Sequence, residues 1–354
     1  MMTSTETVAN LSCRVLRTLP ELQEIASEWR DLFHRSRATA FQSPDWVLPW
    51  IEVFVPEKMV AIAVRSGSRL VGLAPLLIYR REQDRVLAFT GGGVSDYLDF
   101  LIDPQFETEV VSEVFRATLE LDDDWTVLDL TDIPSGSPLL ALLWLKQEVR
   151  EHDSCSVLRL PANQDDVLHL FSKRQRANLR NARSRLQRAG GGQIELAIAE
   201  NVLEFLDDLF KLHSSRWSER GEPGVLSDLQ LRTFHKSSSQ RLIASGMLHL
   251  SRLRSHNKTL AVIYSLLAHE TAFCYLQGFD PEFAALSPGT QLMFHGICES
   301  VQHGMRHFDF LRGREVYKQH WRPSTRPTYR IQLTREALAS GVQNFRDLRV
   351  LNAT

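Results

Sequence analysis

Two segments in the last third of the sequence combine residue types that could bind an anion and move a proton. The first, residues 275–294, reads as a strand, a loop and a helix that begins at Ser287, Pro288, Gly289 and Thr290. Ser287 is expected as the N-cap and Pro288 as the first helical residue. A helix start offers backbone N–H groups, and a glycine there allows close approach, so a pyrophosphate could bind. The alternative is a capped helix start without a ligand.

The second segment, residues 309–321, follows within one helix length and gathers polar and aromatic side chains at the end of an expected strand. Side chains at a strand end often face a cleft. The members of this group are Asp309, Arg312, Glu315, Tyr317, Lys318 and Trp321. For Asp309 the alternative is an ion pair with Arg312 or Arg314.

Charge is distributed unevenly along the chain. The 354 residues hold 41 Lys+Arg and 43 Asp+Glu, so the formal net charge is only −2. Residues 1–165 carry 15 basic and 26 acidic residues, whereas residues 166–354 carry 26 and 17, which gives net charges of −11 and +9. Seven cations and no acid lie in residues 172–188, where Arg176, Arg180 and Arg183 share one helical face. This excess favours an anionic ligand on the second half, with a solvated basic helix as the alternative.

Other patterns of chemical interest are incomplete. The four cysteines are widely spaced and form no CxxC pair, so we expect reduced, mostly buried thiols and no structural zinc site. His303 and His307 have a metal-like spacing, but Gly304 lies between them and argues against a shared helical face, so no metal is expected. The sequence contains neither a phosphate-binding P-loop nor a GxSxG nucleophile motif.

The hydrophobic pattern predicts the elements that must position these residues. In the first half, strands are expected at 12–16, 60–64, 70–78, 85–90, 97–102, 125–130 and 156–160, and helices at 20–33, 43–54, 105–120 and 138–150. In the second half, helices are expected at 172–189, 201–216, 227–244 and 289–302, and strands at 193–199, 247–254, 259–268, 271–278, 308–311 and 329–333. Because both halves follow the same order of elements, the pattern predicts a duplicated α+β module.

Taken in order, these motifs resemble the Fem-like branch of the GNAT acyltransferase superfamily, the group of cellulose-biosynthesis (CelD-type) acetyltransferases. The resemblance covers most of residues 12–335. It is carried by residues 91–97, residues 172–190, Arg216-Trp217 followed by Gly221, Gly278-Phe279-Asp280, Ser287-Pro288-Gly289, residues 309–313, Tyr317, Lys318 and Trp321. It implies an α+β fold with tandem GNAT-like domains, in which mixed central sheets are flanked by helices. The expected boundaries are 10–165 for the N-terminal domain, 166–335 for the C-terminal domain with the donor site, and 336–354 for a tail.

The function that the resemblance implies is an acyl-CoA-dependent N- or O-acyltransferase, acting by direct transfer on an amine or hydroxyl of a sugar or polysaccharide-related acceptor. Acetyl-CoA or another acyl-CoA is the expected co-substrate, held by Ser287, Pro288, Gly289 and Thr290. Direct transfer needs a base for the acceptor, donors for the oxyanion and an acid for the leaving thiolate, without a covalent enzyme intermediate.

Within that scheme, the residues of the strand-end group divide the proton and charge transfers among them. Asp309 or Glu315 is expected as the base and Tyr317 as the acid. Lys318 or Arg312 is expected to hold acceptor or phosphate charge.

Further residues are expected to bind the substrates. Asp96 and Tyr97 would line the acceptor side, with a glycine turn and a capping aspartate as the alternative. Arg176 and Arg180 would contact phosphates. Arg216 and Trp217 would clamp a sugar or nucleotide, although a tryptophan at a helix end is more often part of a core.

Two other functions stay open at this point. The usual GNAT phosphate loop, Gln/Arg-x-x-Gly-x-Gly/Ala, is absent because only Gly289 is present at the helix start. Fem-type relatives use aminoacyl-tRNA instead of acyl-CoA, and the basic segment would suit tRNA as well. The third possibility is a non-catalytic GNAT-like binding module of a polysaccharide-synthesis system.

The sequence also predicts where the protein works and with what. The longest apolar runs, residues 139–145 and 260–268, are shorter than the ~20 residues that span a bilayer, so we expect no membrane span. The first residues lack the features of a secretory signal, which favours the cytoplasm. The expected partner is a small-molecule or glycan acceptor. A monomer is expected because a duplicated domain makes the chain its own pseudo-dimer.

Overall fold

The computed structural model describes residues 11–122, 125–142, 147–218, 224–313 and 315–343. The chain forms two compact units: unit 1 holds the described residues up to 153 and from 327 onward, and unit 2 holds residues 154–326. This division differs from the boundaries expected at 165 and 335. The difference arises because two long strands, β9 (Val149–Arg159) and β15 (Ser324–Thr334), each begin in one unit and end in the other. Local sequence patterns cannot reveal such an exchange.

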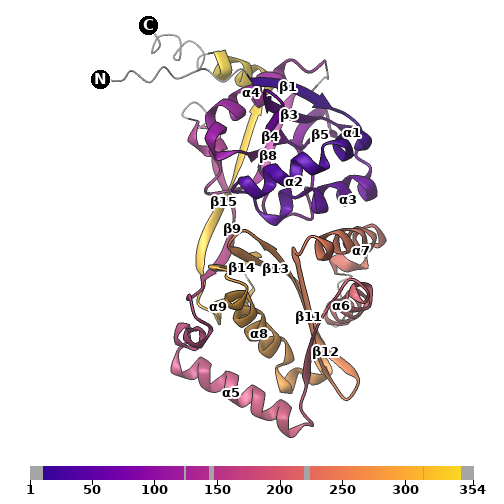
Figure 1. The fold of residues 1–354 in the computed structure, drawn as a ribbon, viewed down its shortest axis with the longest axis vertical. Coiled ribbons are helices and arrows are strands. Elements are labelled where there is room, and N and C mark those ends of the chain that lie inside the picture. Colours follow the sequence, from indigo (N-terminus) through magenta and orange to yellow (C-terminus); the bar gives the residue numbers. More distant parts are fainter. Residues whose placement is uncertain (1–10, 123–124, 143–146, 219–223, 314, 344–354) are drawn as a thin grey trace, which may run out of the picture. The chain divides into compact units, whose positions relative to one another are not determined.

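Unit 1 contains two groups of paired strands (Figure 1). An antiparallel sheet has the order β1-β3-β4-β7, formed by β1 (Leu11–Leu16), β3 (Ala61–Ser66), β4 (Arg69–Ala74) and β7 (Leu101–Ile102). A second group has the order β15-β8-β6-β5-β2, formed with β8 (Val127–Pro134), β6 (Asp84–Phe89), β5 (Leu76–Arg81) and β2 (Lys58–Met59). Between them the groups bury an aliphatic and aromatic core that includes Phe100, Phe115 and Trp125.

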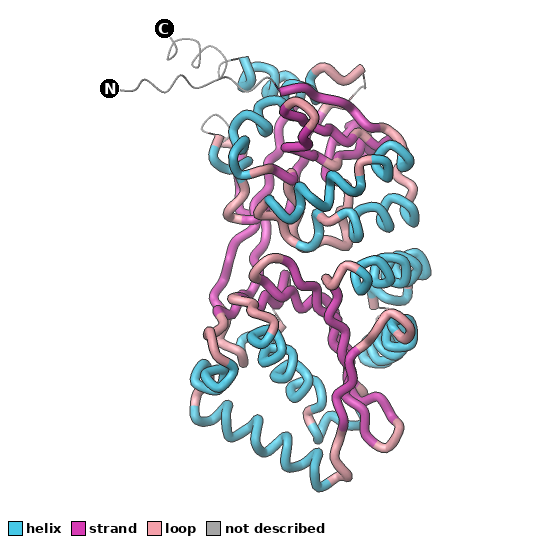
Figure 2. The backbone as a smooth tube through the Cα atoms, viewed as in Figure 1, coloured by secondary structure: helices cyan, strands magenta, loops and turns pink. Residues whose placement is uncertain are grey.

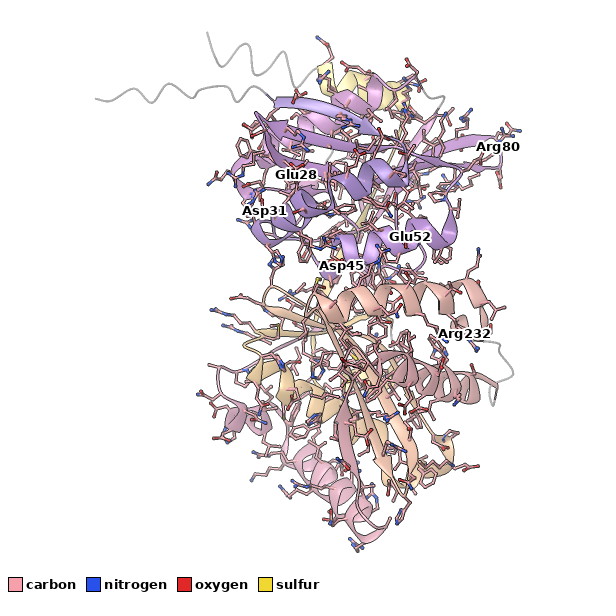
Figure 3. The ribbon with its side chains drawn as sticks, turned by 45° about the vertical axis from the view of Figure 1, so that its right-hand side comes forward. Glu28, Asp31, Asp45, Glu52, Arg80 and Arg232 are labelled. Carbon is pink, nitrogen blue, oxygen red and sulfur yellow. The ribbon has the colours of Figure 1, made fainter. Side chains whose placement is uncertain are left out.

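The helices of unit 1 are α1 (Leu19–Glu24), α2 (Ala26–Arg35), α3 (Pro44–Phe54) and α4 (Glu107–Leu119). Polar side chains labelled in Figure 3 tie them together. Glu28 of α2 accepts a hydrogen bond of 2.9 Å from Arg65 of β3, and Asp45 of α3 accepts one of 2.7 Å from Arg30 of α2. These ties hold α2 between α3 and the antiparallel sheet.

Four expectations for unit 1 need correction. The helix expected at 20–33 is two helices that divide at Ile25, and the strand expected at 70–78 is divided by Pro75 into β4 and β5. The strand expected at 97–102 is only β7. The helix expected at 138–150 is wrong in its described residues: Pro138–Ala141 form a 3-10 turn, and Val149 already belongs to β9. The apolar run there lacks a polar face, so it had no helical period to define it.

Unit 2 is built on a meander of four antiparallel strands followed by a parallel one (Figure 1). The meander comprises β10 (Gln193–Leu196), β11 (Leu248–Ser255), β12 (Lys258–Ala268) and β13 (Thr271–Phe279). The parallel strand is β14 (His307–Arg312), which pairs in turn with β9. Pairing of β13 with β14 runs from Thr271 to Phe273, whereas β13 continues to Phe279. The last six residues of β13 therefore extend past this pairing, and the residues that line the cavity described below include two of them.

Helices cover both faces of this meander (Figure 2). They are α5 (Lys173–Arg188), α6 (Val202–Ser218), α7 (Leu229–Ala244), α8 (Pro288–Gln302) and the short α9 (Val316–Gln319). Helix α6 packs closely on β13, because a Cβ at Gly278 would lie 3.0 Å from the Cβ of Leu212. On the other face, α8 buries Leu292, Met293 and Ile297 in the core of unit 2.

Most sequence-based expectations for unit 2 are confirmed, including the basic helix, the meander and the helix that begins at Pro288. None of the helices in the described part of the chain is both long and apolar enough to cross a membrane.

Candidate active site

A cavity of about 490 Å³ opens in unit 2 at the start of α8. Its floor is formed by Gln277 and Phe279, which lie on the part of β13 that extends beyond the pairing with β14. Two further walls are the first turn of α8 and the face of α5 that contacts this turn through Arg185. The remaining side is closed by Tyr317, His320 and Trp321, from α9 and the turn that follows it. Four separate segments of unit 2 thus converge on one site.

The first turn of α8 presents backbone and a hydroxyl to this cavity through Ser287, Pro288, Gly289 and Thr290. Ser287 is the N-cap, as expected, but its backbone is left-handed at φ 52° and its side chain makes no capping hydrogen bond. No acidic residue lies in the first turn, so the positive end of the helix dipole is not neutralised from within the helix. This helix start suits a negatively charged group.

Helix α5 lines the cavity with a polar face and is anchored at both ends. Ser172 caps it in a capping box with Gln175, and the Gln175 amide donates to the His320 carbonyl. Near the other end, Arg185 donates to the Ala285 carbonyl at 2.8 Å and to the Ser287 hydroxyl at 3.1 Å. Arg185 therefore lies directly beside the start of α8 and brings a guanidinium to the cavity.

Aromatic residues give the cavity an apolar end. Phe171 packs edge-on against Trp321 with ring centroids 5.4 Å apart and against Phe294 at 6.2 Å. Phe171 and Trp321 line the cavity together with Tyr317 and His320. A tyrosine phenol and a histidine imidazole are both groups that can donate or accept a proton in a reaction. One end can therefore accept an apolar chain while the α8 end attracts an anion.

Two residues expected in catalysis do not line this cavity. Asp309 is 2% exposed, and its carboxylate accepts the N–H of Leu311 at 2.7 Å, where the backbone is left-handed at φ 61°. Lys318 is 1% exposed and donates to the carbonyls of Leu311, Arg312 and Gly313. Both side chains stabilise the irregular end of β14.

Glu315 and Arg312 also lie outside the cavity lining. Glu315 is exposed, is the N-cap of α9 and pairs with the Lys318 ammonium at 3.0 Å. Arg312 ends β14, and its carbonyl is one of those that accept from Lys318. Of the four residues expected in catalysis, Tyr317 is the one at the cavity.

The residues expected to bind substrates are scattered. Arg176 and Arg180 lie on α5, on a different face from the residues that line the cavity. Asp96 and Tyr97 belong to unit 1, where Tyr97 is buried and its carbonyl accepts from Gln42 at 2.8 Å. Arg216 and Trp217 lie in the last turn of α6, where their side chains fall outside the described residues.

Sequence reasoning missed the α5 residues that do line the cavity. Gln175, Asn178, Ala182 and Arg185 follow one another at intervals of three or four and therefore share a face. The available sequence signal for this face was the polar pair Gln175 and Asn178, which lies between the arginines. Arg176 and Arg180, which the sequence analysis favoured, lie on the neighbouring face of α5. His320 was also missed.

The cysteines fit the expectation of buried, reduced thiols. Cys155, Cys274 and Cys298 are buried and Cys13 is half-buried, all without disulfides. Burial raises the pKa of Cys274 to about 12 and that of Cys298 to about 11. Neither thiol is a thiolate at neutral pH, so neither is suited to be a nucleophile.

Comparison with known proteins places this geometry in context. Residues 173–319 match the family model for the Acetyltransferase (GNAT) domain. The fold is similar to that of FemX, with a TM-score of 0.65, 13% identity, and coverage of 91% of this chain and 97% of that chain. It is also similar to L-PGS from Bacillus licheniformis, with a TM-score of 0.55, 12% identity, and coverage of 93% and 97%. The comparison with curated protein sequences gave no match.

A third solved structure, a conserved protein of unknown function from Bacteroides thetaiotaomicron, gives a TM-score of 0.60 at 13% identity and covers 90% of this chain and 100% of that one. These similarities extend over both units and confirm the expected fold. The chain has a tandem GNAT-like fold, and its residues 173–319 form the GNAT acetyltransferase domain of an acyltransferase.

Proposed function

We propose that the protein is an acyl-CoA-dependent N- or O-acyltransferase of the CelD type, which transfers an acetyl or longer acyl group directly to an amine or hydroxyl of a sugar or polysaccharide-related acceptor. One observation carries the proposal. The cavity of the GNAT domain joins an acid-free helix start and Arg185 at one end to an aromatic wall at the other. An acyl-CoA needs the same combination, because its phosphates are anionic and its acyl chain is apolar.

The donor phosphates would bind at the first turn of α8. Pro288 has no N–H, and the first hydrogen bond across the turn runs from the Gln291 N–H to the Ser287 carbonyl at 3.2 Å. The N–H groups of Gly289 and Thr290 therefore precede the intrahelical pattern and point out of the helix start. The Arg185 guanidinium beside Ser287 adds a full positive charge.

The transfer itself requires two proton movements. The acceptor nitrogen or oxygen attacks the thioester carbonyl while a base removes its proton; the C–S bond then breaks and an acid protonates the leaving thiolate. We assign the acid to Tyr317, which lines the cavity, and the base to His320, which lines it from the next turn. Asp309 and Glu315 are less suited to be the base, because their carboxylates are engaged with the Leu311 N–H and the Lys318 ammonium.

Calorimetric titration of the 354-residue chain with acetyl-CoA and a longer acyl-CoA tests this function. We expect saturable binding that Gly289→Asp weakens about 100-fold or more, because a carboxylate would stand where the phosphates bind. Gly289→Ala is the matched control, since its Cβ would meet Phe279 at an ordinary 3.4 Å and binding should stay close to wild type. Equal binding by the aspartate variant, or no acyl-CoA binding by the wild type, would overturn the proposal.

A second candidate, an aminoacyl-tRNA-dependent transferase, is favoured by the cations of α5 that do not line the cavity. Arg180 and Arg183 are exposed, and Arg176 lies on the same face. Steeply salt-dependent tRNA binding that Arg180→Ala weakens would support this candidate. Binding of acyl-CoA without measurable binding of tRNA would exclude it.

A further inference from the structure

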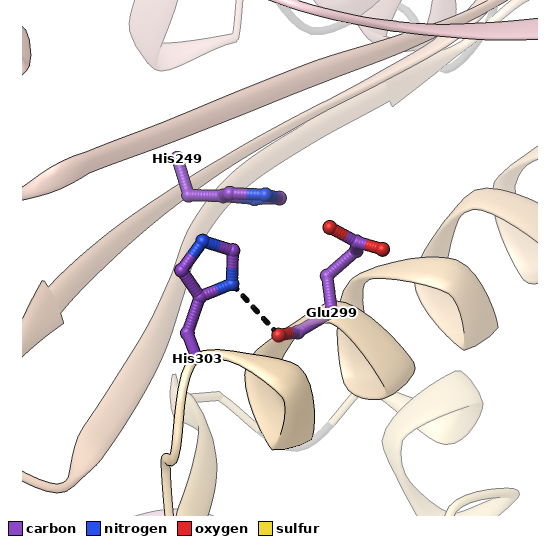
Figure 4. A group of neighbouring side chains, drawn as sticks. All are labelled: His249, Glu299 and His303. Carbon is purple, nitrogen blue, oxygen red and sulfur yellow. Dashed lines mark hydrogen bonds between the residues drawn. The ribbon is translucent and has the colours of Figure 1, made fainter.

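A second group of titratable side chains lies at the opposite end of α8 from the cavity (Figure 4). His303 is the C-cap of α8, Glu299 lies one turn before it, and His249 faces them from β11. Helix α8 has 15 residues, so its two ends are roughly 22 Å apart. This group is therefore separate from the proposed donor site.

The three side chains converge closely enough to share an ion. One ligand atom from each of His249, Glu299 and His303 lies within 4.8 Å of the others. The two imidazole rings stand edge to face, with centroids 5.5 Å apart and an interplanar angle of 71°. Neither ring stacks on the other, and Figure 4 shows the Glu299 carboxylate beside both rings.

The hydrogen bond made by His303 fixes which of its nitrogens can bind an ion. Its Nδ1 lies 2.8 Å from the Glu299 backbone carbonyl. A carbonyl can only accept, so Nδ1 carries the proton and donates it, which leaves the lone pair on Nε2. Histidines that bind metals commonly donate their other ring N–H to a backbone carbonyl in this way.

His249 supplies the second, independent observation. Its Nε2 is buried and has no hydrogen-bond partner among the described residues. A buried polar atom without a partner is costly and calls for an explanation.

We propose that His249, Glu299 and His303 form a binding site for a divalent transition metal ion of the zinc class. Two imidazole nitrogens and one carboxylate oxygen are a ligand set that Zn²⁺ uses, and a fourth position would be left for water or another side chain. In a tetrahedral site the ligand atoms lie about 3.4 Å apart, so separations that are now at most 4.8 Å would shorten by no more than about 1.4 Å on binding. The exposed His303 and the half-buried Glu299 at the helix end allow that movement.

His295 is the candidate for the fourth position. Its Nε2 lies 3.9 Å from a Glu299 carboxylate oxygen, one turn earlier on the same helix. The bound ion would tie β11 to the end of α8, the helix whose other end borders the cavity. We therefore assign the site a stabilising role rather than a catalytic one.

Metal titration of the 354-residue chain tests the proposal. After treatment with a chelator and removal of that chelator, we expect the wild type to bind one equivalent of Zn²⁺ by calorimetry. The melting temperature should rise with Zn²⁺ concentration, because the ion binds the folded state. Co²⁺ should give the visible absorption of a four-coordinate site.

Two variants at the exposed side of the cluster identify the ligands. His303→Gln and Glu299→Gln should each weaken Zn²⁺ binding about 100-fold or more, since even loss of a partner of a metal ligand costs about 10–100-fold. His34→Gln, at an exposed histidine of unit 1, is the matched control and should bind like the wild type. Melting curves recorded without metal show whether each variant folds, so the half-buried His249 need not be changed.

Two results would overturn the proposal. One is the absence of saturable Zn²⁺ or Co²⁺ binding by the wild type. The other is binding that His303→Gln and Glu299→Gln leave unchanged, which would identify an adventitious site elsewhere on the chain.

Discussion

Helices α4 of unit 1 and α8 of unit 2 are approached by the chain in the same way. Each follows a sheet strand and the same short pattern, Asp103-Pro104-Gln105-Phe106 in unit 1 and Asp280-Pro281-Glu282-Phe283 in unit 2. In both, the aspartate accepts the N–H two residues ahead, at 3.1 Å for Asp103 and 3.0 Å for Asp280. The two units share this way of leaving the sheet, with identical residues at three of the four positions.

After that pattern the two helices differ. Helix α4 begins at once with Glu107 and Glu109 in its first turn, so its own carboxylates neutralise its positive end. Helix α8 begins only after the 3-10 turn Pro281–Leu286, which is longer than the turn Pro104–Phe106 before α4. The start of α8 consists of Ser287, Pro288 and Gly289, and its first turn holds no acid. The helix start in unit 2 is thus left open and suits an anion, whereas the helix start in unit 1 is neutralised by its own acids.

The cavities of the two units also differ in whether their cations are already paired with protein carboxylates. Unit 1 has a cavity of about 430 Å³ that includes Trp50, Tyr79, Gly92 and Asp129. Burial by itself would raise the pKa of Asp129, but the ion pairs with Arg330 and Arg81 outweigh burial and lower this pKa. These cations are already engaged with a protein carboxylate, whereas Arg185 in unit 2 contacts only neutral oxygens among its described partners.

The largest expected effect concerns a buried acid of unit 1. Burial raises the pKa of Asp99 to about 7, and the nearby Glu107 adds to this rise. Hydrogen bonds from the Ser137 hydroxyl and the Phe100 N–H act in the opposite direction but do not cancel the effect of burial. Because the folded state holds this proton more tightly than the unfolded state, the contribution of Asp99 to the free energy of unfolding should fall by about 3 kcal/mol between pH 4 and pH 7. Denaturant unfolding followed by tryptophan fluorescence measures the slope.

Asp99→Asn is the control for this pH dependence. The amide cannot titrate, so the decrease between pH 4 and pH 7 should flatten. An unchanged slope in the variant would show that Asp99 is not the group responsible.

The next effect compares a tyrosine in each cavity. Tyr317→Phe removes the proposed acid and should lower the rate of acyl transfer about 100-fold at unchanged acyl-CoA affinity. Tyr79→Phe makes the same change in the cavity of unit 1 and should leave the rate unaltered. Steady-state kinetics with separate kcat and KM decides; equal losses in both variants would remove the distinction between the two cavities.

A smaller effect is expected on α5. Arg185→Ala should weaken acyl-CoA binding about 30-fold, because a hydrogen bond to a charged group is lost. Arg183→Ala removes the same charge from the exposed face of the helix and should change binding less than about twofold at physiological salt. If the two variants weakened binding equally, overall charge would explain the affinity better than the position of Arg185.

Much of the fold could be predicted because its signals are local. Apolar runs separated by turn residues marked β11, β12 and β13 of unit 2, and Ser287-Pro288 marked the start of α8. The exchange of β15 into unit 1 depends on pairing with β8, some 200 residues earlier in the chain, and no local pattern reports it. The Asp-Pro-x-Phe repeat was a sequence signal for the duplication that the order of elements alone did not use.

The site was predictable only in part, for the same reason. Ser287 to Thr290 and Tyr317 lie near each other in the sequence, and the structure brings them to one cavity. Arg185 joins them only through the packing of α5 beside α8, and His249 meets Glu299 only through the packing of α8 on the meander. Residues that only tertiary packing brings together have no characteristic spacing in the sequence.

The most direct test makes the start of α8 resemble that of α4. Thr290→Glu places a carboxylate in the first turn, where α4 has Glu107 and Glu109, and Thr290→Gln adds the same bulk without charge. Acetyl-CoA affinity, measured by calorimetry, should fall about tenfold in Thr290→Glu and stay near wild type in Thr290→Gln. Equal affinities in the two variants would contradict the claim that an acid-free helix start makes unit 2 the donor site.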